Sequence, residues 1–173
     1  MEWLPYKKEI TMIRLATRDD LPRIYEIYAN AREYMRKTGN PDQWGTTEPY
    51  HEWLDKDIER DELYVCYDGD DVYGVFMFMT REEPFYNSPD EGGWLNDEPY
   101  GTVHRIASHG SRKGAFVEAI NFCKSKMDNV RIDTHPNNLT MQNCCEKNGF
   151  TRCGLLTVKR DGSRRIMYHW VKK

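Results

Sequence analysis

The stretch RIDTHPNNLTMQNCCEKNGF, residues 131–150, combines a strand, a helix and the beginning of a second strand. Val130–Thr134 is a short run rich in β-forming residues, which is typical of a buried strand. Asn137 or Asn138 can then cap a helix, because an asparagine side chain accepts a hydrogen bond from an N–H group of the first helical turn. Asn148-Gly149 is the expected end of that helix. The stretch therefore predicts a strand, a short capped helix and a further strand.

The segment immediately upstream has the same order of strand, turn and helix. Tyr100–Ser108 predicts a strand, and the turn His109–Lys113 leads into a helical run from Gly114 to Met127. N–H groups at the start of a helix point towards an anion, and glycine lets the anion come close. The turn is therefore a candidate anion site, with an ordinary glycine-containing link into an amphipathic helix as the alternative.

The rest of the chain predicts further strands and helices around this centre. The expected elements are strands at Thr11–Thr17, Leu63–Tyr67, Val72–Met79, Phe150–Lys159 and Arg164–Val171, helices from about Leu21 to the stop at Gly39-Asn40-Pro41 and from Tyr50 to Arg60, and a long ordered loop at Arg81–Pro99. Strands and helices in this order predict an α/β fold, with a mixed sheet covered by helices and right-handed crossovers near the carboxyl terminus.

Length and composition limit the class of protein. The 173 residues fit a single domain, 1–173, with residues 1–10 as an N-terminal extension. The first residues lack the apolar core of a signal peptide and no segment is typical of a membrane span, so we expect a cytoplasmic protein without membrane contact. A formal net charge of −3 provides no general attraction for nucleic acid.

The five cysteines form an odd-numbered set without CxxC spacing. This pattern argues against a disulfide framework and against a zinc site, so we expect reduced thiols and no bound metal. Most of the thiols are expected to be buried, because a free cysteine packs as a small apolar residue.

The turn and the stretch 131–150, taken together and in this order, resemble the GNAT superfamily of acetyltransferases. HRIASHGSRKGAF, residues 104–116, resembles the loop that binds the diphosphate of acetyl-CoA, usually written Gln/Arg-x-x-Gly-x-Gly/Ala. Gly114 matches the first glycine of that pattern, and Ser111 and Phe116 stand at its two ends. Nearly the whole chain resembles a bacterial group within the superfamily. The shared features are GNPxQW at 39–44, a tryptophan loop at 93–95, HRIAS at 104–108 and RIDTH-x-x-N at 131–138.

The resemblance implies a mixed, mostly antiparallel sheet of six to seven strands with helices on both faces, in which the fourth and fifth strands splay apart. It also implies that acetyl-CoA is the co-substrate and that its pantetheine arm pairs with the fourth strand. The residues implied for this cofactor site are Ile106, Ala107 and Ser108 on the strand, Gly110, Ser111, Arg112, Lys113, Gly114 and Ala115 in the turn, and Asn138 beside the pantetheine arm.

Transfer of an acetyl group to an amine requires a neutral nitrogen, stabilisation of an oxyanion and an acid for the leaving thiolate. His104 is a candidate base, because histidine is suited to proton transfer near neutral pH; a structural histidine is the alternative. By resemblance, Cys145 stands where many members of the superfamily have a tyrosine near the thiolate. A thiol on a packed helix is otherwise an inert small apolar residue.

The acceptor site is expected between two loops rich in aromatic residues, since aromatic faces suit a cationic or apolar substrate. The candidates for its walls are Trp44, Tyr50, Trp94 and Tyr100, with core packing as the alternative. Asp133 and His135 lie at the end of a predicted strand, where they can bind the amine or orient water. Their other possible role is to fix the loop before Pro136 through hydrogen bonds.

Three functions are compatible with the resemblance. The first is an enzyme that moves an acetyl group from acetyl-CoA to a primary amine of a small molecule, by direct attack in a ternary complex. The second is a non-catalytic acyl-CoA-binding or regulatory module on the same fold, and the third is acetylation of a protein or aminoacyl-tRNA amine. The aromatic loops and the acidic charge balance favour the small-molecule amine, and the edge strands of this fold are compatible with a homodimer.

Overall fold

The structure is a computed structural model that describes residues 12–173. The expected N-terminal extension, residues 1–10, and Thr11 of the expected first strand lie outside the described residues. In chain order the elements are β1 (Met12–Leu15), η1 (Arg18–Asp20), α1 (Leu21–Lys37), α2 (His51–Glu59), β2 (Leu63–Asp68), β3 (Asp71–Met79), η2 (Pro84–Asn87), β4 (Glu91–Gly92), β5 (Gly101–Ser108), α3 (Ala115–Lys126), β6 (Asn129–Thr134), α4 (Leu139–Lys147), β7 (Thr151–Thr157) and β8 (Arg164–Val171).

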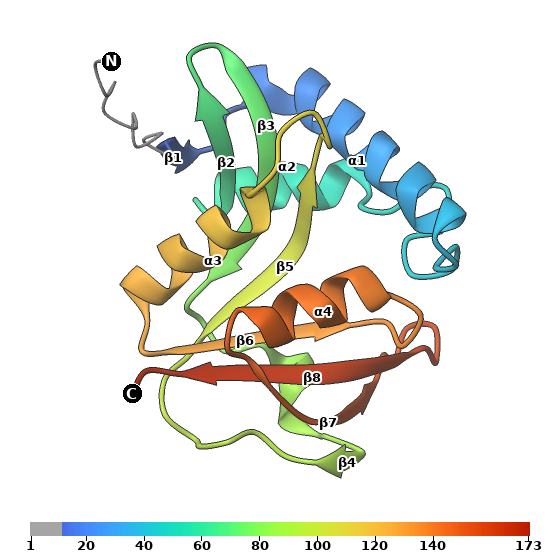
Figure 1. The fold of residues 1–173 in the computed structure, drawn as a ribbon, viewed down its shortest axis with the longest axis vertical. Helices are drawn as coiled ribbons and strands as arrows, with labels where there is room; N and C mark the ends of the chain where they lie inside the picture. Colours follow the sequence, from blue (N-terminus) through green and yellow to red (C-terminus); the bar gives the residue numbers. More distant parts are fainter. Residues whose placement is uncertain (1–11) are drawn as a thin grey trace, which may run out of the picture.

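The strands of the described chain form one eight-stranded sheet in the order β1-β2-β3-β5-β6-β8-β7-β4 (Figure 1). Only β5 and β6 run parallel to each other, and the other neighbouring pairs are antiparallel. This arrangement confirms the predicted mixed, mostly antiparallel sheet. The described residues 12–173 contain eight strands rather than six or seven, because β4 lies inside the segment 81–99 that the sequence predicts to be a loop.

β4 is a two-residue strand that pairs with β7 where both strands contain glycine. Glu91 and Gly92 lie opposite Leu155 and Gly154. A Cβ atom added at Gly154 would lie 2.3 Å from the carbonyl oxygen of Glu91, so this close approach requires glycine. The pairing depends on a partner distant in the sequence, and for that reason the local pattern does not predict it.

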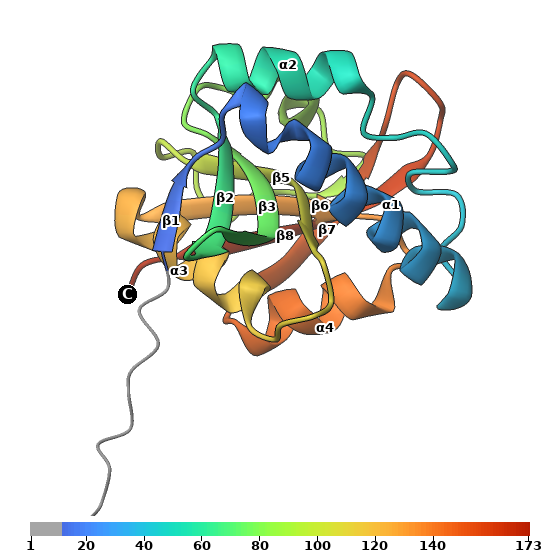
Figure 2. The ribbon, with the colours of Figure 1, turned by 90° about the horizontal axis from the view of Figure 1, so that it is seen from above.

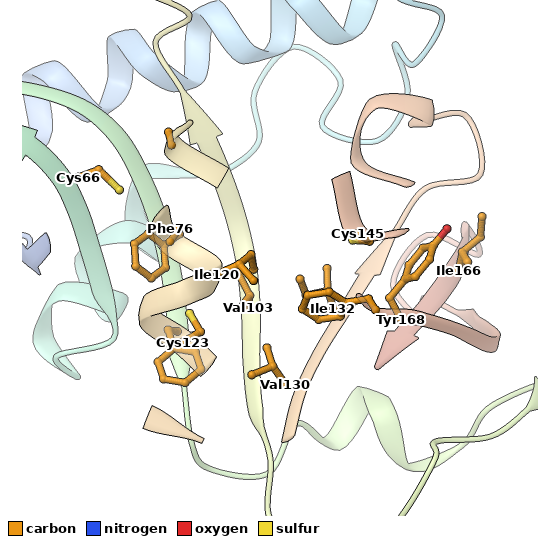
Figure 3. Packing of buried hydrophobic residues seen from close by; sticks show 14 of the residues in the cluster. Cys66, Phe76, Val103, Ile120, Cys123, Val130, Ile132, Cys145, Ile166 and Tyr168 are labelled. Carbon is orange, nitrogen blue, oxygen red and sulfur yellow. The ribbon is translucent and has the colours of Figure 1, made fainter. Parts of the chain in front are cut away.

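The helices cover both faces of the sheet, as the resemblance implies. α1 and α2 lie on one face, and α3 and α4 lie on the other (Figure 2). Ile24 and Ile27 of α1 are fully buried in the first interface. In the second interface, Ile120 of α3 packs in one buried cluster with Val103 of β5 and Ile132 of β6 (Figure 3). Full burial of a large apolar side chain contributes about 1.5–3 kcal/mol. None of the helices in residues 12–173 is long and apolar enough to cross a membrane.

β8 contains a fully buried histidine whose two ring nitrogens both make hydrogen bonds. Leu95 N–H donates to His169 Nδ1 over 3.1 Å, so Nδ1 is unprotonated, and Nε2 donates to Asn129 Oδ1 over 3.1 Å. Burial, together with the positive charge of Arg131, lowers the pKa of His169 to about 4. The neutral imidazole thus joins the loop before β5 to β6 and β8.

Acidification is therefore expected to destabilise the fold through His169. The pKa is lower in the folded chain than in the unfolded chain, so stability falls as the pH drops from about 6.5 to about 4. The loss due to this group is on the order of 2–3 kcal/mol, and urea unfolding across this pH range measures it. His169→Gln, whose amide can make both hydrogen bonds, should flatten the pH dependence, whereas His51→Gln on the surface should not. Equal slopes for wild type and His169→Gln would contradict this explanation.

Candidate active site

The site begins where β5 loses its partner on one side. β6 pairs with β5 only through Gly101–Val103, whereas β3 pairs with β5 as far as Ser108. β6 pairs with β8 along its whole length, and beyond Ile132 it diverges from β5 (Figure 1). β5 and β6 are the fourth and fifth strands when β4 is left out, so the predicted splay is confirmed. On this side, no strand in residues 12–173 covers the backbone of β5 from His104 onwards.

A β-bulge lies in the uncovered part of β5. Arg105 has a φ of +52°, which is uncommon for a residue other than glycine, and the pairing with β3 shifts at this point. Tyr28 of α1 donates its hydroxyl hydrogen to the carbonyl oxygen of Arg105 over 2.7 Å. The Arg105 guanidinium donates to Oδ2 of the buried Asp57 over 2.6 and 3.0 Å. α1 and α2 therefore hold the bulge from one face of the sheet.

A cavity of about 410 Å³ lies along this edge of β5, between α1 and α4. Five of the predicted cofactor residues line it: Ile106, Ala107, Ser108, Gly110 and Asn138. The remaining walls are largely apolar and include Ala31 of α1 and Met141 of α4. An uncovered strand edge beside an apolar cavity suits an extended chain that carries amide groups, because such a chain can pair with the strand while its methylene groups are buried.

At the end of β5 the chain makes the turn that the sequence predicts as an anion site. Gly110 and Gly114 have φ values of +85° and +95°, and Gly114 is the N-cap residue that precedes α3. The first N–H groups of an α-helix have no partner within the helix. The nearest atom to a Cβ added at Gly114 would be Glu118 Oε1 at 3.9 Å, so there is open space beside the N-cap of the helix.

The other residues predicted for the turn have different surroundings. Arg112 donates to Asp68 Oδ2 over 2.8 Å and lies 4.5 Å from the centre of the Tyr73 ring. Ala115 is buried in the core on the α3 side of the sheet. Ser111 and Lys113 belong to the turn but do not line the cavity.

Asn138 connects α4 to the loop that follows α1. Its Oδ1 accepts a hydrogen bond from Met141 N–H over 3.0 Å, which is the predicted helix cap. Its Nδ2 donates to Gln43 Oε1 over 2.9 Å. The same glutamine oxygen accepts a second hydrogen bond, from Asn40 Nδ2 over 2.9 Å. The GNPxQW segment is thereby fixed against the start of α4.

A second cavity of about 230 Å³ adjoins the first. The residues that line both cavities are Met35, Trp44, Ile106, Asn138 and Met141. The second cavity also reaches His104 and Arg105 on β5 and Asp133 on β6. The two cavities therefore meet where β5 and β6 diverge.

His104 lies in the second cavity between two carboxylates. Its Nε2 is 2.8 Å from Glu83 Oε2, which is hydrogen-bond distance, and its Nδ1 is 3.5 Å from Asp133 Oδ1. The buried Tyr86 donates its hydroxyl hydrogen to the same Asp133 oxygen over 2.6 Å. Because Glu83 accepts from Nε2–H, the lone pair of the neutral imidazole lies on Nδ1 and faces the side of Asp133.

The surroundings of Glu83 and Tyr86 determine whether each of these side chains carries its proton. Burial alone would raise the pKa of Glu83, but the hydrogen bond from His104, the charge of His104 when its ring is protonated, and the hydrogen bond from Phe85 N–H outweigh it and hold this pKa below its usual value. Burial, followed by the charge of Asp133, raises the pKa of Tyr86 far above its usual value. Glu83 therefore remains a carboxylate that accepts, and Tyr86 remains a hydroxyl that donates.

The structure divides the predicted acceptor residues into two groups. Trp44 and Asp133 line the second cavity. Trp94 and Tyr100 do not line either cavity; instead their rings lie 4.5 and 3.8 Å from the guanidinium of the buried Arg131. Core packing, the alternative considered for these aromatic residues, accounts for both of them.

Two further predicted residues also lie outside the cavities. Tyr50 is 39% exposed and contacts the edge of the Trp53 ring. His135 Nδ1 accepts a hydrogen bond from Asn137 N–H over 3.0 Å. His135 thus fixes the loop before α4, which is the second of the two roles considered for it.

Cys145 is fully buried in the core next to Ile132 and Tyr168 (Figure 3). Burial raises the pKa of its thiol strongly, and the residue does not line either cavity. All five cysteines are unpaired. The side chain therefore has the packing role of a small apolar residue, and nothing in its position suits proton donation to a thiolate.

Several residues that line the second cavity, or that contact a residue lining it, have no counterpart in the sequence-based predictions. Glu83 lies in the predicted loop, and Arg165 lies on a strand whose pattern indicates only alternation. Gln43 is part of the GNPxQW segment, so its presence in the motif is a signal that could identify it. No local pattern marks Glu83, because its role depends on contact with a strand 21 residues further along the chain.

Comparisons with known proteins agree with this architecture. A model of the acetyltransferase (GNAT) domain matches residues 11–151. A comparison with curated proteins gives no match. Among solved structures, an acetyltransferase of the GNAT family from Streptococcus agalactiae 2603 is 28% identical with a TM-score of 0.84, and the match covers 94% of this chain and 96% of that chain.

More distant structures share the fold. A ribosomal-protein-alanine N-acetyltransferase from Brucella melitensis is 17% identical with a TM-score of 0.59, covering 92% of this chain and 99% of that chain. AAC(6')-Ib, solved with acetyl-CoA and also with ribostamycin and coenzyme A, is 18% identical with a TM-score of 0.60, covering 93% of each chain. The match of the domain model over most of the sequence, on a sheet with the expected splay, shows that this chain belongs to the GNAT family of acetyltransferases.

Proposed function

We propose that the protein transfers an acetyl group from acetyl-CoA to a primary amine of a small molecule, by direct attack in a ternary complex. The observation that carries this proposal is the pair of adjoining cavities that meet where β5 and β6 diverge. One cavity runs along an uncovered strand edge and the other contains a histidine between two carboxylates. The complexes of AAC(6')-Ib with acetyl-CoA and coenzyme A support a donor of this kind for the same fold.

The residues of the first cavity fit acetyl-CoA, which supplies an activated thioester when bound. The backbone of Ile106–Ser108 would pair with the pantetheine arm, and the open start of α3 at Gly114 would bind the diphosphate through its N–H groups. The N–H groups of β5 beside the bulge at Arg105 are available to polarise the thioester carbonyl. These residues would place the acetyl group at the opening between the two cavities.

The residues of the second cavity would prepare the amine. An alkylammonium group with a pKa of about 10.4 must lose a proton before it can attack. His104 Nδ1 carries a lone pair on the side of Asp133, so Asp133 would hold the ammonium group while Nδ1 takes its proton. The nitrogen then forms a bond to the acetyl carbon, the carbon–sulfur bond breaks, and the second proton lost by the nitrogen passes to the thiolate.

The size of the second cavity supports a small acceptor. Its volume of about 230 Å³ is below the range of about 300–1,000 Å³ typical of drug-sized ligands. Trp53 and Phe85 form apolar walls, so the organic part of the acceptor would be compact and partly apolar. A protein terminus or an aminoacyl-tRNA would have to enter through the same restricted space.

The proposal is tested by measuring acetyl-CoA binding and thiol release with the same preparation. Calorimetry should show a 1:1 complex with acetyl-CoA, and a panel of small primary amines should contain at least one that releases free CoA and gains an acetyl group by mass. Binding of acetyl-CoA without turnover of any amine would reject the proposal and indicate a non-catalytic acyl-CoA-binding module. Turnover only with peptides or aminoacyl-tRNA would assign the macromolecular acceptor instead.

Gly114→Asp is expected to weaken acetyl-CoA binding by about tenfold or more, since a carboxylate at the open helix start repels a diphosphate and about 1.4 kcal/mol corresponds to a factor of ten. Gly162→Asp is the matched control. Gly162 also has a positive φ, +72°, and open space around it, but it lies in the turn between β7 and β8. Both substitutions strain the backbone, and only the first should change the Kd measured by calorimetry. An unchanged Kd for Gly114→Asp would remove this turn from the donor site.

A further inference from the structure

The second cavity contains a buried arginine that the proposed mechanism does not use. Arg165 of β8 lines this cavity, and its side chain is only 8% exposed. Its Nη1 donates to Ser163 Oγ over 2.7 Å and to Arg164 O over 3.0 Å, which fixes the guanidinium in position. Its Nη2 donates to no residue within 12–173. Because Arg165 lines the cavity, this charged nitrogen can donate to an anionic group bound there.

Arg165 forms an ion pair with Asp133, and both residues line the cavity. Arg165 Nε lies 3.6 Å from Asp133 Oδ2, which is close enough for charge attraction but longer than a hydrogen bond. The Asp133 side chain is 9% exposed, and its other oxygen faces His104 and Tyr86. The two opposite charges therefore lie side by side, both nearly enclosed and both in contact with the cavity.

The other charged residues that line the cavity already have direct partners. Arg105 is bound by Asp57 over 2.6 Å. Arg160 is bound by Glu48 over 3.0 Å and lies 4.9 Å from the centre of the Trp53 ring. Among the charged side chains lining the cavity, the pair formed by Arg165 and Asp133 is the one that a ligand can still engage on both members.

A second hydrogen-bond donor faces the same cavity. Gln43 Oε1 accepts from both Asn40 and Asn138, so the glutamine NH₂ group is directed away from these amides. No residue in the described range accepts a hydrogen bond from this NH₂ group. The cavity thus presents carboxylate and imidazole acceptors for an ammonium group and, in addition, donors from Arg165 and Gln43 that suit a carboxylate.

From this arrangement we infer that the acceptor is a small zwitterion, an amino acid or a close relative that carries a carboxylate as well as the reacting amine. The inference rests on the proposed function and specifies the substrate class of the same site. The ammonium group lies against Asp133 and His104, and the carboxylate accepts hydrogen bonds from Arg165. A zwitterion placed against an ion pair in this orientation satisfies both charges, whereas a simple amine leaves the Arg165 Nη2 without a partner.

The test compares matched amines that differ only at the carboxylate. Each of a set of amino acids is measured beside its amide and its decarboxylated amine, and CoA release gives kcat/KM for each compound. The kcat/KM of at least one amino acid should exceed the kcat/KM of its own amide by tenfold or more. The amine of the amide loses its proton more readily than that of the parent amino acid, so amine protonation would favour the amide and cannot produce this preference.

Variants of Arg165 connect the preference to the structure. Arg165→Met should reduce the ratio of amino acid to amide to about one, mainly through a higher KM for the amino acid, and Arg165→Lys should retain part of it. Arg164→Met is the matched control, because Arg164 is the adjacent residue on β8 and makes an exposed ion pair with Glu91. Thermal denaturation of all three variants identifies any that fail to fold. If Arg165→Met fails to fold, Arg165→Lys replaces it in the comparison with the wild type.

The possible outcomes separate this inference from the proposed function. Turnover of amines with equal kcat/KM for acids and amides, or a preference that survives in Arg165→Met, would overturn the zwitterion assignment and leave the acetyltransferase proposal intact. If no amine is acetylated, the proposed function fails, and calorimetry of the same compounds with the enzyme–CoA complex decides the inference. Carboxylate-dependent binding that is lost in Arg165→Met would support it, and binding that does not depend on the carboxylate, or no binding, would overturn it.

Discussion

Replacing His104 by alanine is expected to lower kcat by about 10²- to 10⁴-fold, the usual contribution of a general base, while the Kd for acetyl-CoA stays unchanged. The reason is geometric: Glu83 accepts from Nε2–H over 2.8 Å, so the Nδ1 lone pair is directed to the side of Asp133, where the amine is proposed to bind. Steady-state kinetics with the best acceptor of the panel, together with calorimetry of acetyl-CoA, measures both quantities.

The controls for this prediction distinguish a base from a structural histidine. His51→Ala removes an exposed histidine that stacks on Tyr25 and should leave kcat unchanged. Added imidazole should restore part of the activity of His104→Ala, because the small base can enter the space left by the side chain. A His104→Ala variant that keeps most of its activity, or one whose only defect is lost stability, would contradict the role of His104 as the base.

Removing Asp57 is expected to have the largest effect on stability. Asp57→Ala removes the carboxylate that binds the Arg105 guanidinium, whose other neighbour is the Trp53 ring. Breaking a buried ion pair in this way costs about 3–5 kcal/mol. The same change should lower activity, because Arg105 forms the bulge next to His104. Urea unfolding measures the loss of stability, and the residual activity of the folded fraction measures the second effect.

A neighbouring aspartate on α2 provides the comparison for Asp57. Asp55 makes an ion pair with Arg18 on the surface, so Asp55→Ala should cost less than about 1 kcal/mol. The double variant Asp57→Leu with Arg105→Met removes both charges and should be more stable than Asp57→Ala alone. If Asp57→Ala and Asp55→Ala cost the same, the buried pair does not stabilise the bulge.

The fold could be predicted from the sequence largely because its elements have strong local signals. Asn138 caps α4 and the chain reverses at Gly149 as the local pattern indicates. β4 could not be predicted in the same way, since its two residues form a strand only by pairing with Gly154 of β7. The splay of β5 and β6 follows from the resemblance and not from any pattern within either strand.

The site could be predicted only in part, for a similar reason. The backbone positions of Ile106–Ser108 follow from their place in the strand, so their contact with the first cavity could be anticipated. Trp94 and Tyr100 are predicted pocket walls because aromatic faces suit a cationic or apolar substrate, but the buried cation of Arg131 provides a packing partner that no local pattern reveals. The facing of a strand residue such as His104 likewise depends on the bulge that follows it.

The central claim is that acetyl-CoA binds along the uncovered edge of β5, with its thioester where β5 and β6 diverge. A crystal structure of the protein with coenzyme A bound tests it most directly. We expect density for the pantetheine arm beside the backbone of Ile106–Ser108 and for the diphosphate at the turn before α3. Coenzyme A bound elsewhere on the protein, or β5 and β6 paired along their whole length with the cofactor present, would contradict it.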